Sequence, residues 1–378
     1  NNTWINGTPD FTDGTNKVAS PSASLEYGLA WSGDGGGSSQ FWTANFGQDS
    51  TFAGTETAQG NQDDNGFGDF YYSPPSGFLA LSSANLPISD DIDPAQTDDD
   101  FPQKNFNVLT YTGNGSTQSI SNLGFQPDLC WIKQRDGTNH GSLYDSNRGV
   151  TKRLKSSSTE QETTVVAGFT GFDSDGFSLG SATENNGSSS TYVAWCWRAN
   201  GGTTSSNSDG SITTTLQAGK GFSIGTYTGT GSNATVGHGL GAVPDFTIFR
   251  ERSSSGNWVV TSQKNMSSND HNLYLQLSNA ESDGNYFQNT AMTSSVISIG
   301  THADINGSSN TYVMYNWINV EGYQRFDKYT GNGSTDGPFI YTGFRPRMLF
   351  IKRTDSAANW QVRDTARRTF NVHDVTLN

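Results

Sequence analysis

Tyr111-Thr112-Gly113-Asn114-Gly115-Ser116 is the stretch that decides the fold, because the chain repeats it twice more. It returns as Tyr-Thr-Gly-Thr-Gly-Ser at residues 227–232 and as Tyr-Thr-Gly-Asn-Gly-Ser at residues 329–334. At a nearly constant distance behind each copy, a Pro opens an apolar run (Pro127, Pro244 and Pro346). Landmarks that keep the same order and spacing indicate an internal repeat of about a hundred residues.

A third landmark closes the first two copies of the repeat. It is Thr-Tyr-Val-Ala-Trp-Cys-Trp at residues 191–197 and Thr-Tyr-Val-Met-Tyr-Asn-Trp at residues 311–317. Such β-branched and aromatic residues favour strands, and Asn-Gly pairs supply the positive φ angles of tight hairpins. Because side chains alternate along a strand, Val193, Trp195 and Trp197 share one side, which we take as the core side.

The third copy contains no counterpart of this closing segment, since the equivalent point after Pro346 lies beyond Asn378. We expect either that the natural polypeptide continues or that another chain supplies the strand by β-addition.

The sequence therefore predicts an all-β protein of tandem antiparallel β-sandwich domains, jelly-roll or lectin-like, joined by short linkers. No window shows a sustained apolar period of 3.6 residues, so little helix is expected. The expected domains are residues 1–87, a first β-sandwich; 88–104, an acidic linker; 105–199, repeat 1; 200–218, a Gly/Ser linker; 219–321, repeat 2; and 322–378, a truncated repeat 3.

Composition excludes some classes of partner. The formal net charge is −14 and charged residues make up only 15% of the chain. An acidic surface disfavours phosphate backbones and anionic lipids, so we expect no nucleic-acid binding. No apolar run approaches the roughly 20 residues of a membrane span, so we expect no membrane insertion. The two cysteines, Cys130 and Cys196, are too few for a disulfide framework, and we expect free, partly buried thiols in preference to a disulfide.

The motifs resemble a known family. Tyr-Ser-Pro-Pro-Ser-Gly-Phe-Leu-Ala-Leu at residues 72–81, followed by the Tyr-Thr-Gly-Asn-Gly-Ser repeats, is similar to large virion structural proteins of tailed phages, especially marine and cyanobacterial ones. In that family a SPRY-like (concanavalin-like) β-sandwich precedes the repeats. The resemblance implies that residues 1–87 are the C-terminal part of such a sandwich. It implies a location on the virion surface and partners that are other virion proteins and further copies of the chain.

Few residues suggest bound metal or catalysis. Asp173 and Asp175 precede a Gly and are candidates for part of a Ca²⁺ shell, since hard cations want clustered oxygens. The alternative is an Asp-Gly hairpin without a cation. No two of the five His residues have the spacing of metal ligands, and solvated loop positions are expected for them. No other cofactor is expected.

Trp258 and Trp360 occupy equivalent places after the Pro-initiated runs of the second and third copies. If exposed, they are candidates for stacking on the sugar rings of a host-surface glycan. The alternative is a core Trp in each sandwich.

Three hypotheses for function follow. The first is a non-enzymatic virion structural protein, in a tail fibre, appendage or head decoration, with a role in assembly and host adhesion. The second is a carbohydrate-binding, lectin-like array of β domains. The third is a depolymerase-type hydrolase, which would need paired carboxylates in a cleft.

Overall fold

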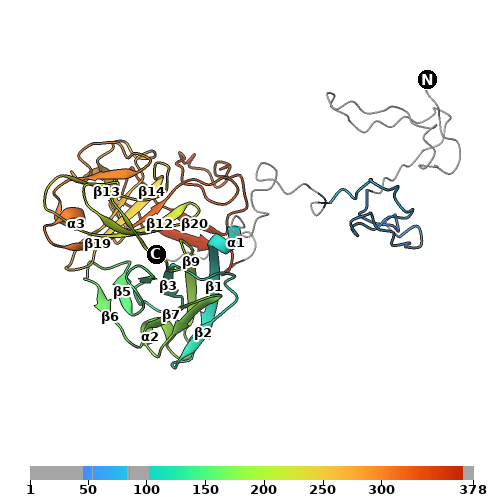
Figure 1. Ribbon diagram of the computed structural model, residues 1–378, viewed down its shortest axis with the longest axis horizontal. Coiled ribbons are helices and arrows are strands. Elements are labelled where there is room, and N and C mark those ends of the chain that lie inside the picture. Colours follow the sequence, from blue (N-terminus) through green and yellow to red (C-terminus); the bar gives the residue numbers. More distant parts are fainter. Residues whose placement is uncertain (1–45, 53, 83–84, 86–101, 369–378) are drawn as a thin grey trace, which may run out of the picture. The chain divides into compact units, whose positions relative to one another are not determined.

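The computed structural model describes residues 46–52, 54–82, 85 and 102–368 (Figure 1). The chain divides into two compact units, Asn1–Ile88 and Ser89–Asn378. Regular structure in the described residues is almost entirely β, apart from three helices of four residues each: α1 Pro102–Asn105, α2 Thr183–Asn186 and α3 Ala303–Asn306. The predicted all-β class is confirmed.

The described residues of the first unit form turns around one carboxylate. Asp63 accepts hydrogen bonds from the backbone N–H groups of Phe67 (2.9 Å) and Ala80 (2.8 Å) and from the Asn85 side chain (2.6 Å). The described part of this unit contains one isolated bridge, Asn61 to Phe70, and no strand. The β-sandwich expected for residues 1–87 therefore has no strand among its described residues, and residues 1–45 lie outside the described residues.

Repeat 1 is a sandwich of two antiparallel sheets. The larger sheet has the order β1-β9-β3-β4-β5-β6 and the smaller one the order β2-β8-β7. The strands are β1 Phe106–Thr112, β2 Gln118–Ile120, β3 Leu129–Gln134, β4 Ser142–Asp145, β5 Lys152–Lys155, β6 Thr163–Thr164, β7 Phe169–Asp173, β8 Gly176–Leu179 and β9 Thr191–Trp197.

Repeat 2 has the same plan with a wider sheet. Its strands are β10 Ser205–Asn207, β11 Thr214–Ala218, β12 Phe222–Thr228, β13 Ala234–Gly237, β14 Phe246–Glu251, β15 Trp258–Thr261, β16 His271–Tyr274, β17 Ser282–Asp283, β18 Val296–Ile299 and β19 Thr311–Trp317. The sheet order is β10-β11-β12-β19-β14-β15-β16-β17, and β13 pairs with β18. The expected linker at residues 200–218 thus contains two strands of this sheet.

The repeated motif has the same structural role in both repeats. Tyr111 lies opposite Tyr192 and Tyr227 opposite Tyr312, with ring centroids 5.0 Å and 5.1 Å apart. A Cβ on Gly113 would lie 2.3 Å from the Gly187 carbonyl oxygen, so only glycine fits. The same contact occurs in repeat 2 at Gly229. The duplication predicted from sequence is therefore a duplication of topology and register.

The closing strands β9 and β19 are buried on both faces. Tyr192, Ala194 and Cys196 face the small sheet of their own sandwich, within one hydrophobic cluster. Val193, Trp195 and Trp197 face the other way, into a second cluster that contains residues of all three repeats. The side that we took as the core of each sandwich is therefore the side on which the repeats pack together.

Repeat 3 contains two strands among the described residues, β20 Met348–Ile351 and β21 Gln361–Asp364, which pair with each other. Residues 325–347 form no strand. In Figure 1, β20 lies beside the strands of the other repeats and not at the end of an extended array. The expected string of separate domains is therefore, for the second unit, one compact body.

Because the repeats share a core, damage at its centre should weaken all of them together. Trp317 contacts Trp197 of repeat 1 (centroids 5.9 Å apart) and Phe222 of repeat 2 (4.9 Å). We expect Trp317→Ala to reduce the free energy of unfolding by about 3–5 kcal/mol. Hydrogen exchange should show lost protection in β1 and β3 as well as β12 and β14. Val166→Ala, at a side chain that is 75% exposed, is the control; loss confined to repeat 2 would contradict a shared core.

Candidate functional site

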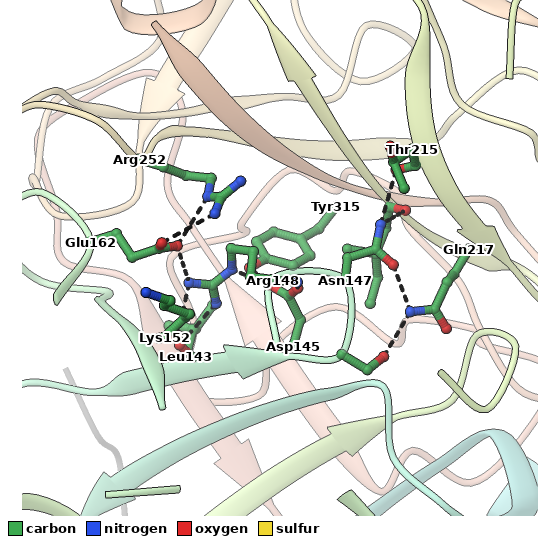
Figure 2. Close-up of polar contacts among 12 residues, drawn as sticks. Leu143, Asp145, Asn147, Arg148, Lys152, Glu162, Thr215, Gln217, Arg252 and Tyr315 are labelled. Atoms are coloured by element: carbon green, nitrogen blue, oxygen red, sulfur yellow. Dashed lines mark hydrogen bonds and ion pairs between the residues drawn. The ribbon is translucent and has the colours of Figure 1, made fainter. Parts of the chain in front are cut away.

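A network of polar side chains lies where repeat 1 meets repeat 2 (Figure 2). At the end of β4, Asp145 accepts a hydrogen bond from the backbone N–H of Arg148 (2.9 Å). The Asp145 carboxylate also forms an ion pair with Nε of Arg148 (2.5 Å). Both side chains are fully buried. Gly149, at φ +91°, turns the chain directly afterwards and directs it into β5. We call this arrangement the Asp–Arg pair.

The remaining donors of Arg148 are also used. Nη2 donates to the Leu143 carbonyl (3.0 Å), and Nη1 donates to Glu162 (3.0 Å) and to the Lys152 carbonyl (3.0 Å). Burial alone would disfavour its charge, but Asp145, Tyr315 and Glu162 outweigh that effect and raise the pKa of Arg148. A buried guanidinium with every nitrogen paired is a structural cation that is not available to a substrate.

Glu162 joins the two repeats. It accepts hydrogen bonds from Arg148 of repeat 1 and from Nε (3.0 Å) and Nη2 (3.1 Å) of Arg252 in repeat 2. Burial raises the pKa of the Glu162 carboxyl, but the hydrogen bond from Arg252 and the charge of Arg148 together hold it below its usual value. The carboxylate therefore stays ionised between the two cations.

Tyr315 of β19 completes the junction from the other side. Its hydroxyl donates to Oδ2 of Asp145 (2.6 Å), and burial raises its pKa well above the usual value, so it remains a neutral donor. Nearby, the Asn147 amide donates to the carbonyls of Thr215 and Ile224 (both 3.0 Å) and accepts from Gln217 (2.5 Å), as Figure 2 shows. The end of β4 and the loop after it thus contact the early strands β11 and β12 of repeat 2 and its last strand, β19.

Trp258 and Arg250 fasten repeat 2 to the end of β5. The Trp258 indole N–H donates to the Lys155 carbonyl (2.9 Å), and Arg250 donates to the Thr159 (2.8 Å) and Glu160 carbonyls. The guanidinium carbon of Arg250 lies 5.5 Å from the centroid of the Trp258 ring. Burial lowers the pKa of Arg250 to about 10, so it still carries its charge at neutral pH.

The junction between repeats 2 and 3 uses the same contacts. The Trp360 indole N–H donates to the Tyr274 carbonyl (2.9 Å), just as the Trp258 indole N–H donates to the Lys155 carbonyl. Tyr274 ends β16 and Lys155 ends β5, which are equivalent strands of the two repeats. Two backbone bonds also recur. Glu281 N–H to Thr354 O (2.8 Å) matches Glu162 N–H to Arg252 O, and Ala358 N–H to Ser278 O (2.8 Å) matches Gly256 N–H to Thr159 O. Docking of one repeat on the next is therefore a repeated interaction.

Repeat 3 also contacts repeat 1. Asp364 and Arg367 form a second Asp–Arg pair (2.6 Å) with both side chains fully buried. The Asp364 carboxylate accepts from the Trp195 indole N–H (3.1 Å), and Trp195 and Tyr315 hold the same position in β9 and β19. In a linear array Asp364 would face a fourth repeat. Here it faces the first, so the series of repeats closes on itself after three.

A small cavity of about 60 Å³ marks the place where the three repeats meet. Its lining comes from all three of them, through Trp131 and Trp195 of repeat 1, Leu275 of repeat 2, and Phe350 and Trp360 of repeat 3. Trp131 lies edge-on to Phe350, with ring centroids 5.9 Å apart. The cavity belongs to the seam between the repeats.

The structure places the sequence-predicted sites as follows. Trp258 is fully buried and Trp360 is 8% exposed, each with its indole N–H bonded to a neighbouring repeat. Neither ring offers a face to a sugar. Both rings are core residues, as the alternative to sugar binding expected, but they lie between repeats and not inside one sandwich.

Asp173 and Asp175 lie in the hairpin that joins β7 to β8. Asp173 accepts from the Ser178 hydroxyl (2.6 Å), whereas the exposed Asp175 accepts from the backbone N–H groups of Asn122 (3.1 Å) and Gly124 (2.6 Å). The two carboxylates thus serve different segments. The described residues contain no group of three His, Cys, Asp or Glu side chains able to hold a metal ion.

Cys130 and Cys196 lie directly opposite each other on β3 and β9, with sulfur atoms 3.6 Å apart, and both are free and fully buried. Burial raises the pKa of Cys130 well above its usual value, which keeps the thiol unreactive. Their burial is complete where partial burial was expected.

His238 departs from the expected solvated loop position. It is fully buried and its Nε2 lies 3.2 Å from the Thr293 carbonyl oxygen. Burial lowers its pKa. His373 lies outside the described residues.

The sequence did not lead us to predict the Asp–Arg pairs or the bridging role of Glu162. One signal was available, because Asp-x-x-Arg follows the second apolar segment in repeats 1 and 3, at residues 145–148 and 364–367. Repeat 2 has Ser262 and Asn265 there, which interrupts the pattern.

The hydroxyl of Tyr315 supplies a direct test of the junction. Tyr315→Phe leaves the packing intact but removes the donor to a buried carboxylate. We expect a loss of about 1.5–3 kcal/mol in the free energy of unfolding, measured by denaturant titration. Tyr341→Phe, at a ring that is 69% exposed, should change little. Equal effects from the two variants would contradict the assignment.

His238 should make stability depend on pH. Its pKa is lowered in the folded state, so below the unfolded value of about 6.5 the unfolded chain binds a proton that the folded chain does not. Stability should therefore be fully present above that pH and fall as the pH is lowered toward the folded pKa. His238→Gln should flatten this slope in thermal unfolding measured from pH 7.5 to 5, whereas His140→Gln should retain it.

Comparison with known proteins adds one relationship. No curated protein and no solved structure matches the chain. Among the described residues, no helix is long and apolar enough to cross a membrane. A family model described as "Domain of unknown function (DUF7483)" matches residues 101–378, a range that includes all three repeats. Since that match covers most of the sequence, the chain belongs to the DUF7483 family.

Proposed function

We propose that the chain is a non-enzymatic structural protein of a tailed-phage virion, on a tail fibre, another appendage or the head surface. Its main task is assembly, with contact to a host surface as a second task. The observation that carries the proposal is the use of buried charge. Asp145, Arg148 and Glu162 form a chain of ion pairs within repeat 1, and Glu162 extends it across the junction to Arg252 of repeat 2.

The energetics support a cohesive role. A buried acceptor that loses its hydrogen-bond donor typically costs about 1–3 kcal/mol, and more when the acceptor is charged. Separating the repeats would break the ion pair between Glu162 and Arg252 and would leave the Asp145 and Asp364 carboxylates without their aromatic donors. A particle protein exposed outside a cell benefits from such cohesion, and the motif resemblance to virion proteins supports the same context.

The body differs in form from a string of separate domains. Repeats 1 to 3 form one compact unit, so they would act as a rigid block. An extended projection from the particle would have to be formed by another part of the protein. This form suits a decoration or a fibre-associated block better than a flexible stalk.

The carbohydrate-binding alternative loses the two tryptophans that were its candidates, since both are buried between repeats. The hydrolase alternative needs a pair of carboxylates facing a cleft. Asp145 and Asp364, the carboxylates at the centre of the body, are each bonded to Arg and to an aromatic donor. Neither alternative gains an observation from the described residues.

The proposal predicts that the polypeptide is a component of purified particles. Mass spectrometry of density-gradient-purified virions of the encoding phage should find it at a fixed ratio to the major capsid protein, and antibodies should label intact particles. The control is a non-structural protein from the same infection, which should be removed by the gradient. Finding the chain in infected cells but not in particles would overturn the proposal.

A further inference from the structure

A row of polar side chains crosses the interior of repeat 2. Ser223 of β12 lies opposite Asn316 of β19, which in turn lies opposite Thr247 of β14. Thr247 lies opposite Thr261 of β15, and the register of β15 with β16 continues the row to Asn272. All five residues are fully buried. We call them the polar row.

The polar row faces the interior of its own sandwich and not the core shared by the repeats. Thr247 lies two residues before Phe249, and Asn316 lies two residues after Met314. Phe249 and Met314 belong to the apolar cluster inside repeat 2. Because side chains two residues apart in a strand share a face, the row continues that cluster with hydroxyl and amide groups.

Several groups of the polar row have no partner among the described residues. Asn316 Nδ2 donates to the Ser223 hydroxyl (3.1 Å), and the Thr261 hydroxyl donates to a carbonyl of β16 (3.4 Å). The Thr247 hydroxyl, Asn316 Oδ1 and both polar atoms of the Asn272 amide bond to nothing in the described part of the chain. Unpaired buried polar groups are costly, and in folded proteins ordered water commonly pairs with them.

Repeat 1 closes the equivalent region with thiols and aromatic rings. By register, the counterparts are Cys196 for Asn316, Cys130 for Thr247 and Tyr144 for Thr261. The fully buried Tyr144 ring stacks on Phe169 of β7, with ring centroids 4.9 Å apart. The same cluster contains Phe125, which lies two residues before Pro127.

Tyr286 restores one ring to the interior of repeat 2. It stands at the position of Gly168, because the Gly300 N–H bonds to the Tyr286 carbonyl (2.6 Å) as the Gly180 N–H bonds to the Gly168 carbonyl (2.7 Å). Its hydroxyl donates to Asp304 (2.9 Å), so this donor does not serve the polar row.

Repeat 2 lacks two elements that cover this region in repeat 1. The exposed Ala242 takes the position of Phe125, two residues before the Pro. Phe287, the residue after Tyr286, corresponds to the first residue of β7, but no strand forms there. Gln288 and Asn289 turn the chain instead, with φ angles of +57° and +49°. The small sheet of repeat 2 therefore consists of β13 and β18, without a third strand.

We propose that the polar row binds water inside repeat 2. One water molecule lies between the Thr247 hydroxyl and Asn316 Oδ1, and a second lies at the Asn272 amide. Hydroxyl and amide groups both donate and accept, as water does, and a buried water typically makes about three hydrogen bonds. The duplicated sandwich is thus dry in repeat 1 and hydrated in repeat 2. The inference does not depend on the proposed function.

A crystal structure of the full chain, at a resolution that shows ordered water, tests the site directly. We expect a peak the size of one water oxygen within hydrogen-bonding distance of Thr247 Oγ1 and Asn316 Oδ1, and another at the Asn272 amide. Repeat 1 is the internal control and should show no peak beside Cys130 and Tyr144. Side chains of the row bonded directly to one another without a peak, or density for a larger molecule, would overturn the proposal.

Variants of similar shape test the same point in solution. Thr247→Val and Asn272→Leu each remove a partner of a bound water, so we expect the equilibrium constant of unfolding to rise about two- to tenfold in denaturant titration. A dry row predicts the opposite sign, because the same changes would remove unpaired polar atoms from the interior. Thr215→Val, at an exposed position of β11, is the control and should change little. An unchanged or lower constant for both variants would contradict bound water.

Discussion

The burial of each closing strand on both faces is the constraint on which the rest of the second unit depends. One face of β9 or β19 builds the interior of its own sandwich, and the other face builds the interior shared by the repeats. A strand buried in this way cannot tolerate polar side chains on either side unless they are paired. This requirement accounts for the Tyr, Val and Trp of the motif and for the carboxylates that meet its aromatic donors.

Two buried ion pairs, one in repeat 1 and one in repeat 3, also stabilise the contacts between repeats. At Asp145 and Asp364 an arginine three residues later returns to the carboxylate, and an aromatic donor arrives from another repeat. Each pair is formed locally, within one turn, so it can be in place before the repeats meet. Docking then adds a neutral hydrogen-bond donor to a charge that is already compensated, which avoids burying a new charge at that step.

Sequence predicted the parts of the fold that depend on local pattern. The repeat and the β class follow from the spacing of the repeated motifs, period-2 alternation and turn residues. The Trp197 side is a core side, but alternation does not say which of two apolar faces belongs to which core, so the sequence could not show that this side forms the interior shared by the repeats. Gly/Ser-rich composition concealed the short strands β10 and β11. The contacts of Trp258, Glu162 and Arg252 depend on how repeats dock, which no local pattern encodes.

The three seams of the body are unequal, and this should decide how it yields to force. Ser262 and Asn265 of repeat 2 stand where repeats 1 and 3 have Asp–Arg pairs, so the seam at that position lacks a buried carboxylate. Under tension the molecule should part there first, with the ionic seams surviving longer. The distribution of buried charge thus sets the order in which the three seams separate.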